Sequence, residues 1–265
     1  MARNTDFRVL GFGLLAFGAV ACGGDPSVDE LSANALSANA LSANALSANA
    51  LSANALSANA LSANALSANA LSANALTAAA LEDPLAREFL TYVVSCALPA
   101  DAVVDMTIDG AEYKFPGSLG LAPEWGRDGG HCDATCQRWV TACVLARVDF
   151  LGVHRIISVR GASPSLHTSW QELRDYQDDE ATYFGNLFAP GAPKYACLGP
   201  GKKEIPRVCG DSLEQCPMEV VGSCTRACSF QGPAGGFVDC SSSGKARKPE
   251  VFHESVTVFL PKSDM

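Results

Sequence analysis

Cysteine is the residue type whose number and spacing in this chain point most directly to chemistry. The sequence of 265 residues contains 11 cysteines, of which Cys22 stands alone near the amino end. Setting Cys22 aside leaves an even set after residue 81, and an even set in an exported chain is typical of disulfide bonds. The predicted disulfide cysteines are Cys96, Cys132, Cys136, Cys143, Cys197, Cys209, Cys216, Cys224, Cys228 and Cys240.

Zinc binding is the alternative use of closely spaced cysteines. Zinc sites favour CxxC pairs, often combined with an HxxxH pair. The close pairs here are instead CxxxC, at Cys132/Cys136 and Cys224/Cys228. We therefore expect disulfides, and the sequence predicts no metal and no cofactor.

The first four cysteines can be paired by geometry if they close among themselves. Four cysteines allow three pairings. Cys136 and Cys143 on one helix would lie about 10.5 Å apart, beyond the roughly 7 Å Cα limit for a disulfide, and Cys132 to Cys143 is longer still. The pairing that remains is Cys96–Cys143 with Cys132–Cys136. The last six cysteines allow about 15 pairings, and the sequence does not choose among them.

The residues before Cys22 predict export. Arg3 and Arg8 precede an apolar run at 9–21, which is typical of a secretory signal and too short for a membrane span of about 20 residues. The run ends in Ala19-Val20-Ala21-Cys22, which resembles the lipobox of bacterial lipoproteins. The resemblance implies cleavage before Cys22 and acylation of its thiol. An ordinary signal peptide, cleaved near residue 21 without acylation, is the alternative.

A lipid on Cys22 sets the expected location and partners. Acyl chains contribute about 0.8 kcal/mol per buried methylene, so several chains anchor a protein firmly. Gly23 stands where an Asp usually signals retention of lipoproteins in the inner membrane, so the resemblance implies the outer membrane. We expect the membrane as one partner and an extracellular protein or glycan as another. The net charge of −9 excludes nucleic acid, because its phosphates would be repelled.

Residues that could carry catalysis are sparse. The histidines are His131, His154, His167 and His253, and none belongs to an HxxxH or HExxH pattern. No GxSxG nucleophile motif is present. The sequence therefore predicts no catalytic residue and leaves enzymatic activity uncertain, with a hydrolase that uses His131 or His154 as one alternative.

Two further groups could bind a ligand. The acidic run from Asp175 to Glu180 lacks the alternating spacing of a calcium loop, so we expect a solvated turn. Among the tryptophans, Trp139 is predicted in the core. Trp125 lies in a loop rich in Gly and Pro, and we expect it to be exposed, where it could line a glycan site.

The chain divides into four parts by composition. Residues 1–21 are the predicted lipoprotein signal peptide, 22–30 the lipidated amino terminus and spacer, 31–80 a repeat, and 81–265 a disulfide-rich domain. The repeat unit LSANA occurs nine times from Leu31 to Ala75, and LTAAA follows.

The conformation of the repeat is left open by its sequence. A helix would turn about 140° per unit and would spread its leucines around the whole cylinder. The five-residue period resembles the pentapeptide-repeat family, which implies a short solenoid. A disordered tether is the third alternative, because identical units specify no register. In each case we expect a spacer between the lipid and the domain.

The composition and patterning of residues 81–265 predict an α+β domain. Asp83 is a predicted helix N-cap and Pro99 ends that helix. Strands at 103–108 and 111–115 flank Asp109-Gly110, a hairpin turn signal. The later predicted elements are a helix at 134–151 capped by Asp133, a strand at 153–160, an apolar stretch at 181–188 after a polar one, an irregular region rich in cysteine, and a strand at 251–260.

Four segments of the domain resemble a group of myxobacterial-type cysteine-rich lipoproteins. They are FLTYVVSCAL at 89–98, FPGSLGLAPEW at 115–125, CDATCQRWVTACVLAR at 132–147 and YFGNLF at 183–188. The resemblance implies an exported, lipid-anchored, disulfide-bonded protein and transfers no catalytic role. We expect a lipid-anchored cell-envelope protein with a structural or binding surface module. A secreted, hydrolase-like enzyme and a disulfide-rich inhibitor or effector are the alternatives.

Overall fold

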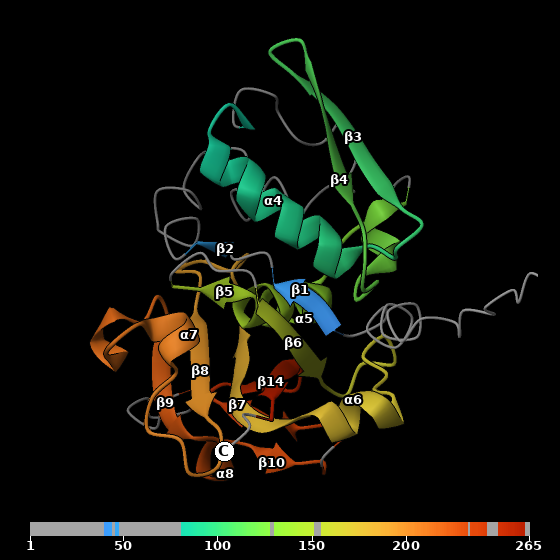
Figure 1. Ribbon diagram of the computed structural model, residues 1–265. Coiled ribbons are helices and arrows are strands. Elements are labelled where there is room, and N and C mark those ends of the chain that lie inside the picture. Colours follow the sequence, from blue (N-terminus) through green and yellow to red (C-terminus); the bar gives the residue numbers. More distant parts are fainter. Residues whose placement is uncertain are drawn as a thin grey trace, which may run out of the picture.

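The computed structural model describes residues 40–43, 46–47, 81–127, 130–150, 155–232, 234–242 and 249–262. The predicted signal peptide, Cys22, His154 and most of the repeat lie outside the described residues. From residue 81 onward the chain forms an α+β domain in which helices stack on one face of a mixed sheet (Figure 1).

Two helices form the layer above the sheet, and both begin where the sequence predicts. α4 (Pro84–Ala97) starts after Asp83 and α5 (Ala134–Ala146) after Asp133. Each aspartate accepts a hydrogen bond from a backbone amide of the first turn, at 2.9 Å and 2.8 Å. These caps satisfy amides that a helix start leaves unpaired. Within the described ranges, no helix is both long enough and apolar enough to cross a bilayer.

α5 ends earlier than the predicted helix at 134–151. The chain leaves the helix after Ala146 and forms β5 (Val148–Asp149). The Phe150 amide donates a hydrogen bond to the Arg207 carbonyl at 2.6 Å, which holds this segment on a path away from the helix. As a result the Phe150 side chain is 38% exposed.

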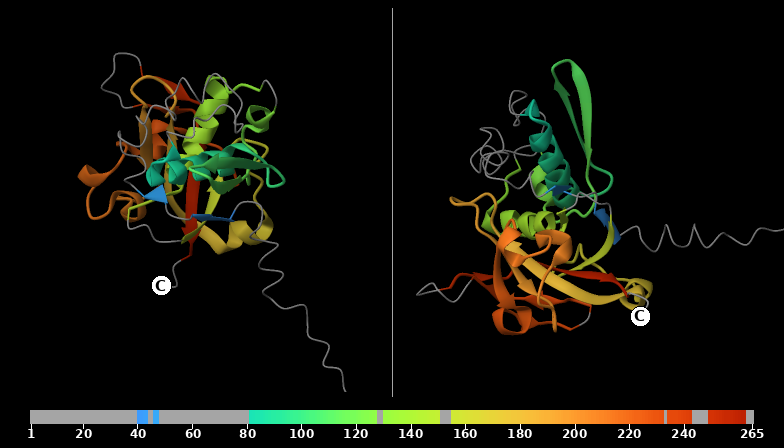
Figure 2. Two further views of the ribbon diagram at one scale, coloured as in Figure 1. Left: turned by 90° about the horizontal axis from the view of Figure 1, so that it is seen from above. Right: turned by 60° about the vertical axis from the view of Figure 1, so that its left-hand side comes forward.

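β3 (Val103–Ile108) and β4 (Ala111–Pro116) form the predicted hairpin. Its turn residues, Asp109 and Gly110, have φ values of 49° and 77°, as a type I′ turn requires. Alternate residues of β3 are buried, so one face of the hairpin packs on the domain. The tip projects beyond the rest of the domain (Figures 1 and 2).

The central sheet has six strands in the order β1-β6-β14-β7-β8-β9. Neighbours are antiparallel except β8 and β9, which are parallel. The domain strands are β6 (Arg155–Arg160), β7 (Tyr176–Gly185), β8 (Lys194–Leu198), β9 (Glu219–Ser223) and β14 (Ser255–Pro261). The predicted strand at 251–260 is thus divided into β13 (Val251–Phe252) and β14.

Short elements surround the sheet. The helical ones are η2 (Pro123–Gly126), α6 (Trp170–Asp175), α7 (Pro206–Cys209), η3 (Leu213–Gln215) and α8 (Cys224–Ala227). The strands are β10 (Ser229–Phe230) paired with β11 (Phe237–Val238), and β12 (Cys240–Ser241) paired with β13 (Val251–Phe252). These short pieces make up the irregular C-terminal third that the sequence predicts.

Apolar side chains form two cores, one on each face of the sheet. The larger core lies between the sheet, α5 and α4, and it includes Phe89, Tyr183 and Val258. Tyr183 and Phe184 are successive residues of β7, so their side chains point to opposite faces. The smaller core consists of Phe184, Cys197, Cys224, Phe237, Cys240 and Phe252.

Two short segments of the repeat are described, and both pair with the domain. β1 (Ala40–Ala43) lies antiparallel to β6, and β2 (Leu46–Ser47) lies parallel to β5 (Figure 1). Strand pairing is not among the conformations that the repeat predicts. An edge strand such as β6 presents unpaired backbone groups, and backbone pairing requires no particular side chain from the added strand.

Five disulfides link the described cysteines. Cys96–Cys143 and Cys132–Cys136, with Cα–Cα distances of 6.0 Å and 5.2 Å, confirm the pairing that the sequence predicts for the first four. The last six pair as Cys197–Cys224, Cys209–Cys216 and Cys228–Cys240. No disulfide joins the first group to the second, so the helical layer and the C-terminal third are each closed separately.

Candidate functional site

A β-bulge in β7 turns Glu180 into the domain. The pairing of β7 with β14 shifts between Val258, which faces Ala181, and Phe259, which faces Asp179. Glu180 is therefore the extra residue that a bulge inserts. It is only 3% exposed. The expectation that the acidic run is a solvated turn was wrong, because its second half lies within β7.

Arg207 of α7 neutralises Glu180. Its Nε donates to the two carboxylate oxygens at 3.0 Å and 3.1 Å, and its Nη2 donates to Oε2 at 2.5 Å. The Nη1 group donates to the Val148 carbonyl at 2.5 Å. The Tyr183 hydroxyl accepts from Nη2 and donates to Glu180, both at 3.2 Å. One guanidinium thus joins α7 to β5 and to the bulge of β7.

Burial and charge act in opposite directions on these groups. Burial alone would lower the pKa of Arg207, but the adjacent Glu180 carboxylate outweighs it and the pKa is raised. Burial, together with the same carboxylate, raises the pKa of Tyr183 well above its usual value. Both groups therefore keep their protons at physiological pH, and the cluster is a structural charge pair rather than an acid–base site.

A pocket of about 410 Å³ opens beside this charge pair. Small-molecule sites have volumes of roughly 300–1,000 Å³. The pocket lies between the end of β5, the segment at 202–211 and the end of β14. Its ionisable lining residues are Asp149, Arg155, Glu180, Lys202, Glu204, Arg207 and Asp211.

Each cationic group of the pocket already has an anionic partner. The Arg155 Nε lies 3.3 Å from Oδ2 of Asp149, a carboxylate that is almost fully buried. The Lys202 Nζ lies 2.7 Å from Oδ1 of Asp178, and Arg207 is paired as described above. The cations of the pocket are therefore neutralised within the protein.

Two carboxylates of the pocket are different. Glu204 and Asp211 are exposed, and among the described residues neither forms an ion pair. The pocket thus has negative charge that no ion pair within the described residues balances. Its apolar lining residues, Phe150, Pro206 and Leu260, offer contact to a hydrocarbon part of a ligand. The arrangement suits a small molecule that carries an amine.

Asp179, the residue before Glu180, is half-buried at the same bulge. Its Oδ1 has no hydrogen-bond partner within the described part of the chain. A Cβ at Gly199 would lie 2.2 Å from the Asp179 carbonyl oxygen, so only glycine permits this close approach. Burial, offset in part by Arg160, raises the pKa of Asp179 to about 6.

Two of the described histidines, His131 and His167, do not line the pocket. His131 and His167 are exposed, and His154 lies outside the described residues. Since neither exposed histidine lines the pocket, its geometry offers them no role as a general base.

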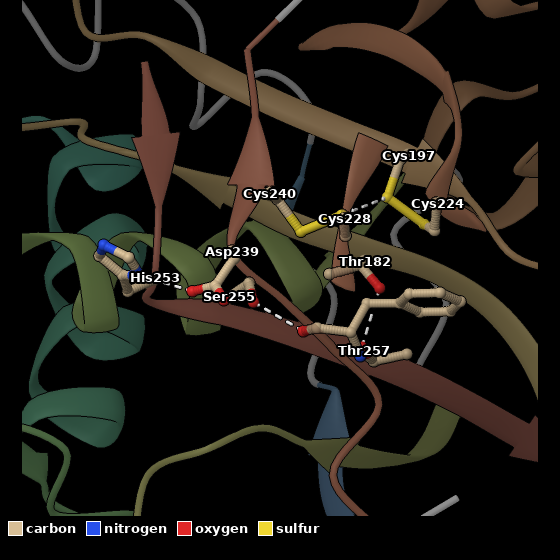
Figure 3. The surroundings of a disulfide bond; sticks show 10 residues. Thr182, Cys197, Cys224, Cys228, Asp239, Cys240, His253, Ser255 and Thr257 are labelled. Atoms are coloured by element: carbon tan, nitrogen blue, oxygen red, sulfur yellow. Dashed lines mark hydrogen bonds and ion pairs between the residues drawn. A yellow bond between two sulfur atoms is a disulfide. The ribbon is translucent and has the colours of Figure 1, made fainter. Parts of the chain in front are cut away.

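Within the described ranges, His253 and Asp239 form a histidine–carboxylate contact of the kind found in a catalytic triad. The His253 Nδ1 lies 2.5 Å from Oδ1 of Asp239 (Figure 3). The Ser255 hydroxyl instead donates to the Phe237 carbonyl at 2.7 Å. No hydroxyl or thiol of a described residue is hydrogen bonded to this imidazole, so the pair lacks the nucleophile that a triad needs.

The structure contradicts the predicted position of one tryptophan and agrees with that of another. Trp125 is fully buried, with its ring edge-on to Phe188 at 5.5 Å, so the expectation of an exposed aromatic was wrong. Trp139 is partly buried against the larger core, as expected. Trp170, at the start of α6, is 88% exposed.

From the sequence, Glu180 was named only as part of the acidic run, and Arg207 and the pocket carboxylates Glu204 and Asp211 were missed. Glu180 and Arg207 are separated by 27 positions and belong to no common motif. The one local signal is the acidic run itself, because charged residues within a strand need a buried partner or solvent. Comparison with protein-family models, curated proteins and solved structures finds no match to this chain.

Glu180→Gln should destabilise the protein by about 3–5 kcal/mol, because it leaves the buried Arg207 charge without its counter-charge. In the double variant Glu180→Leu/Arg207→Met the free energy of unfolding should fall by much less than the sum of the falls in Glu180→Leu and Arg207→Met alone, since no isolated charge remains. Urea unfolding at pH 7 measures both. As a control, Lys114→Ala/Asp105→Ala removes an exposed pair and should change stability by at most about 1 kcal/mol. Additive losses at 180 and 207 would contradict the pairing.

Asp179→Asn should stabilise the protein increasingly between about pH 4 and about pH 6. An unfolded Asp titrates near about 3.9, whereas the folded pKa is about 6. Between these values the folded state keeps a proton that the unfolded state has released, so the wild-type free energy of unfolding falls as pH rises. The variant lacks this fall. Denaturant unfolding measured at intervals of pH tests it, and a constant difference between the two proteins across this range would contradict it.

Proposed function

We propose that this chain is an exported, lipid-anchored cell-envelope protein whose disulfide-bonded domain is a binding module. The observation that carries the proposal is the cysteine count. The five disulfides use ten of the 11 cysteines, and Cys22 remains outside these pairs. A single cysteine left over at the end of a secretory signal is the residue that lipoprotein processing would acylate.

The density of disulfides supports a location outside the cytoplasm. Structural disulfides persist in oxidising compartments and are rare where glutathione and thioredoxin keep thiols reduced. Each disulfide stabilises by typically about 2–4 kcal/mol, which is a large share of the total stability of about 5–15 kcal/mol for a domain. A cytoplasmic protein would lose that stabilisation.

The repeat strands limit how far the domain stands from its lipid. Because β1 begins at Ala40, only residues 23–39 separate Cys22 from the sheet edge. These 17 positions, 39 minus 22, span at most about 60 Å when fully extended. The domain would therefore lie close to the membrane surface, and the pocket would meet ligands that are near the envelope.

The pocket beside Arg207 is the proposed binding site. Its volume suits a small molecule, and Glu204 and Asp211 supply the charge that would hold an amine, such as that of an amino sugar or a diamino acid. The hydrolase-like alternative has no comparable support, because none of the described histidines lines this pocket.

One observation favours the alternative of an inhibitor or effector. The β3–β4 hairpin projects from the domain, and in the sequence it lies between the bridged residues Cys96 and Cys132 (Figure 2). A projecting hairpin between two disulfide-bonded segments has a shape that could insert into a partner's cleft. The pocket remains the better-supported site because its charge and volume define a ligand class.

Cys22→Ser should release the protein from the membrane fraction and abolish incorporation of labelled palmitate, because acylation requires the thiol. Fractionation of cells expressing the full chain, with intact mass of the purified protein, measures both. Cys209→Ser/Cys216→Ser is the matched control: it removes a disulfide and should leave lipidation unchanged. An unlipidated mature chain in wild type would overturn the anchoring proposal.

Glu204→Gln/Asp211→Asn should abolish amine binding at the pocket without loss of fold, since both carboxylates are exposed and unpaired. Thermal shift against a panel of amino sugars, diamino acids and polyamines identifies a binder in wild type. The control Glu112→Gln/Glu214→Gln removes equal charge from exposed positions outside the pocket and should bind as wild type does. Equal loss in both variants would show a general charge effect instead of a site.

A further inference from the structure

Two disulfides meet in the smaller core. Cys224 is the first residue of α8 and Cys228 directly follows its last residue, where the Cys228 amide donates to the Cys224 carbonyl at 2.9 Å. This hydrogen bond closes the turn that brings the two cysteines together. Cys224 is bonded to Cys197 of β8, and Cys228 is bonded to Cys240 of β12.

The two disulfides are in sulfur–sulfur contact. The Sγ atoms of Cys197 and Cys228 lie 3.5 Å apart although they belong to different bridges (Figure 3). The sulfurs of Cys197, Cys224 and Cys228 all lie within 4.8 Å of one another. Cys197 therefore has two candidate partners, one bonded and one in contact.

The four cysteines differ in access. Cys197, Cys224 and Cys240 are fully buried, whereas Cys228 is half-buried. Thiol–disulfide exchange requires that a thiolate reach a bridge sulfur. Cys228 is consequently the bridge sulfur that an external thiolate can reach first to start the exchange.

We propose that these four cysteines form a thiol–disulfide exchange site that reacts with an external dithiol. One thiolate of the dithiol attacks Cys228, the Cys228–Cys240 bond breaks, and Cys240 leaves as a thiolate. The second thiol of the dithiol then attacks the dithiol sulfur that is bonded to Cys228. This closes the disulfide of the dithiol and releases Cys228 as a thiolate. Two electrons and two protons pass from the dithiol, which becomes a disulfide, to this cysteine pair.

The released Cys228 thiolate then acts within the protein. It attacks Cys197 across the 3.5 Å contact, forms Cys197–Cys228 and displaces Cys224 as a thiolate. This second step is an isomerisation with no net electron transfer. β8 stays bonded to α8 through a different residue, while β12 is released from its bridge. The reduced state therefore carries its thiols on Cys224 and Cys240.

Two single variants of the full chain test the exchange. Cys240→Ser starts with a free Cys228, and Cys224→Ser starts with a free Cys197. Both should arrive at the same Cys197–Cys228 bridge after incubation at pH 8, with Cys224 alkylated in the first and Cys240 alkylated in the second. Non-reducing peptide mapping after acid quenching and alkylation reads the outcome.

A control and a wild-type measurement make the test independent of variant folding. The control variant Cys216→Ser leaves Cys209 free. It should be alkylated only at Cys209, with the other four native bridges intact. Wild-type protein treated with limiting dithiothreitol should yield a two-thiol species alkylated at Cys224 and Cys240. Alkylation of wild type at Cys228 and Cys240, or of the variants only at Cys228 and Cys197 respectively, would overturn the proposal.

Discussion

The joint between the helical layer and the sheet is the contact on which the domain depends, and it is not covalent. The disulfides of α4 and α5 close within residues 96–143, and the others close within 197–240. The two groups are held together by packing of α5 on β7 and β14, where Val140, Tyr183 and Val258 are fully buried. Burial of large apolar side chains contributes about 1.5–3 kcal/mol each, so this joint is strong only if the sheet beneath it keeps its shape.

The shape of the sheet in turn depends on the bulge at Glu180. A bulge bends its strand and changes the direction of one side chain, and here the redirected side chain is a carboxylate that burial alone would disfavour. Arg207 compensates that charge, and its guanidinium, which belongs to α7, donates hydrogen bonds to β7 and to β5. The same contact places α7 beside the end of β5 and thereby forms a wall of the pocket. A single ion pair thus links the strand geometry to the candidate site.

Local signals in the sequence account for much of the fold. The Asp109-Gly110 turn and the two aspartate caps act through neighbouring backbone groups, so their effect can be read from a few residues. Helix rise alone was enough to exclude two of the pairings of the first four cysteines. These elements appear as predicted because no distant contact competes with them.

The errors arise where distant contacts decide. α5 stops at Ala146, and beyond it the Phe150 amide bonds to the Arg207 carbonyl while the Arg207 side chain bonds to the Val148 carbonyl, 59 positions away. Trp125 lies in a loop by every local sign, yet η2 directs it against Phe188. The bulge that buries Glu180 is defined by register with β14, far along the chain. The candidate site consists of such contacts, and for this reason the sequence indicated almost none of it.

The smaller core explains why sulfur atoms gather so closely in the C-terminal third. Its strands are mostly two residues long, and such short hairpins have little stability of their own. Its buried aromatic rings are Phe184, Phe237 and Phe252, with Tyr195 packed against them, and small apolar cores usually need disulfides. Two bridges, anchored at the first residue of α8 and at the residue after its end, supply that stabilisation in the space of a few side chains. Bridges confined to so small a volume come into contact, and contact is the condition for exchange between them. The stabilising arrangement and the proposed reactivity therefore have one physical origin.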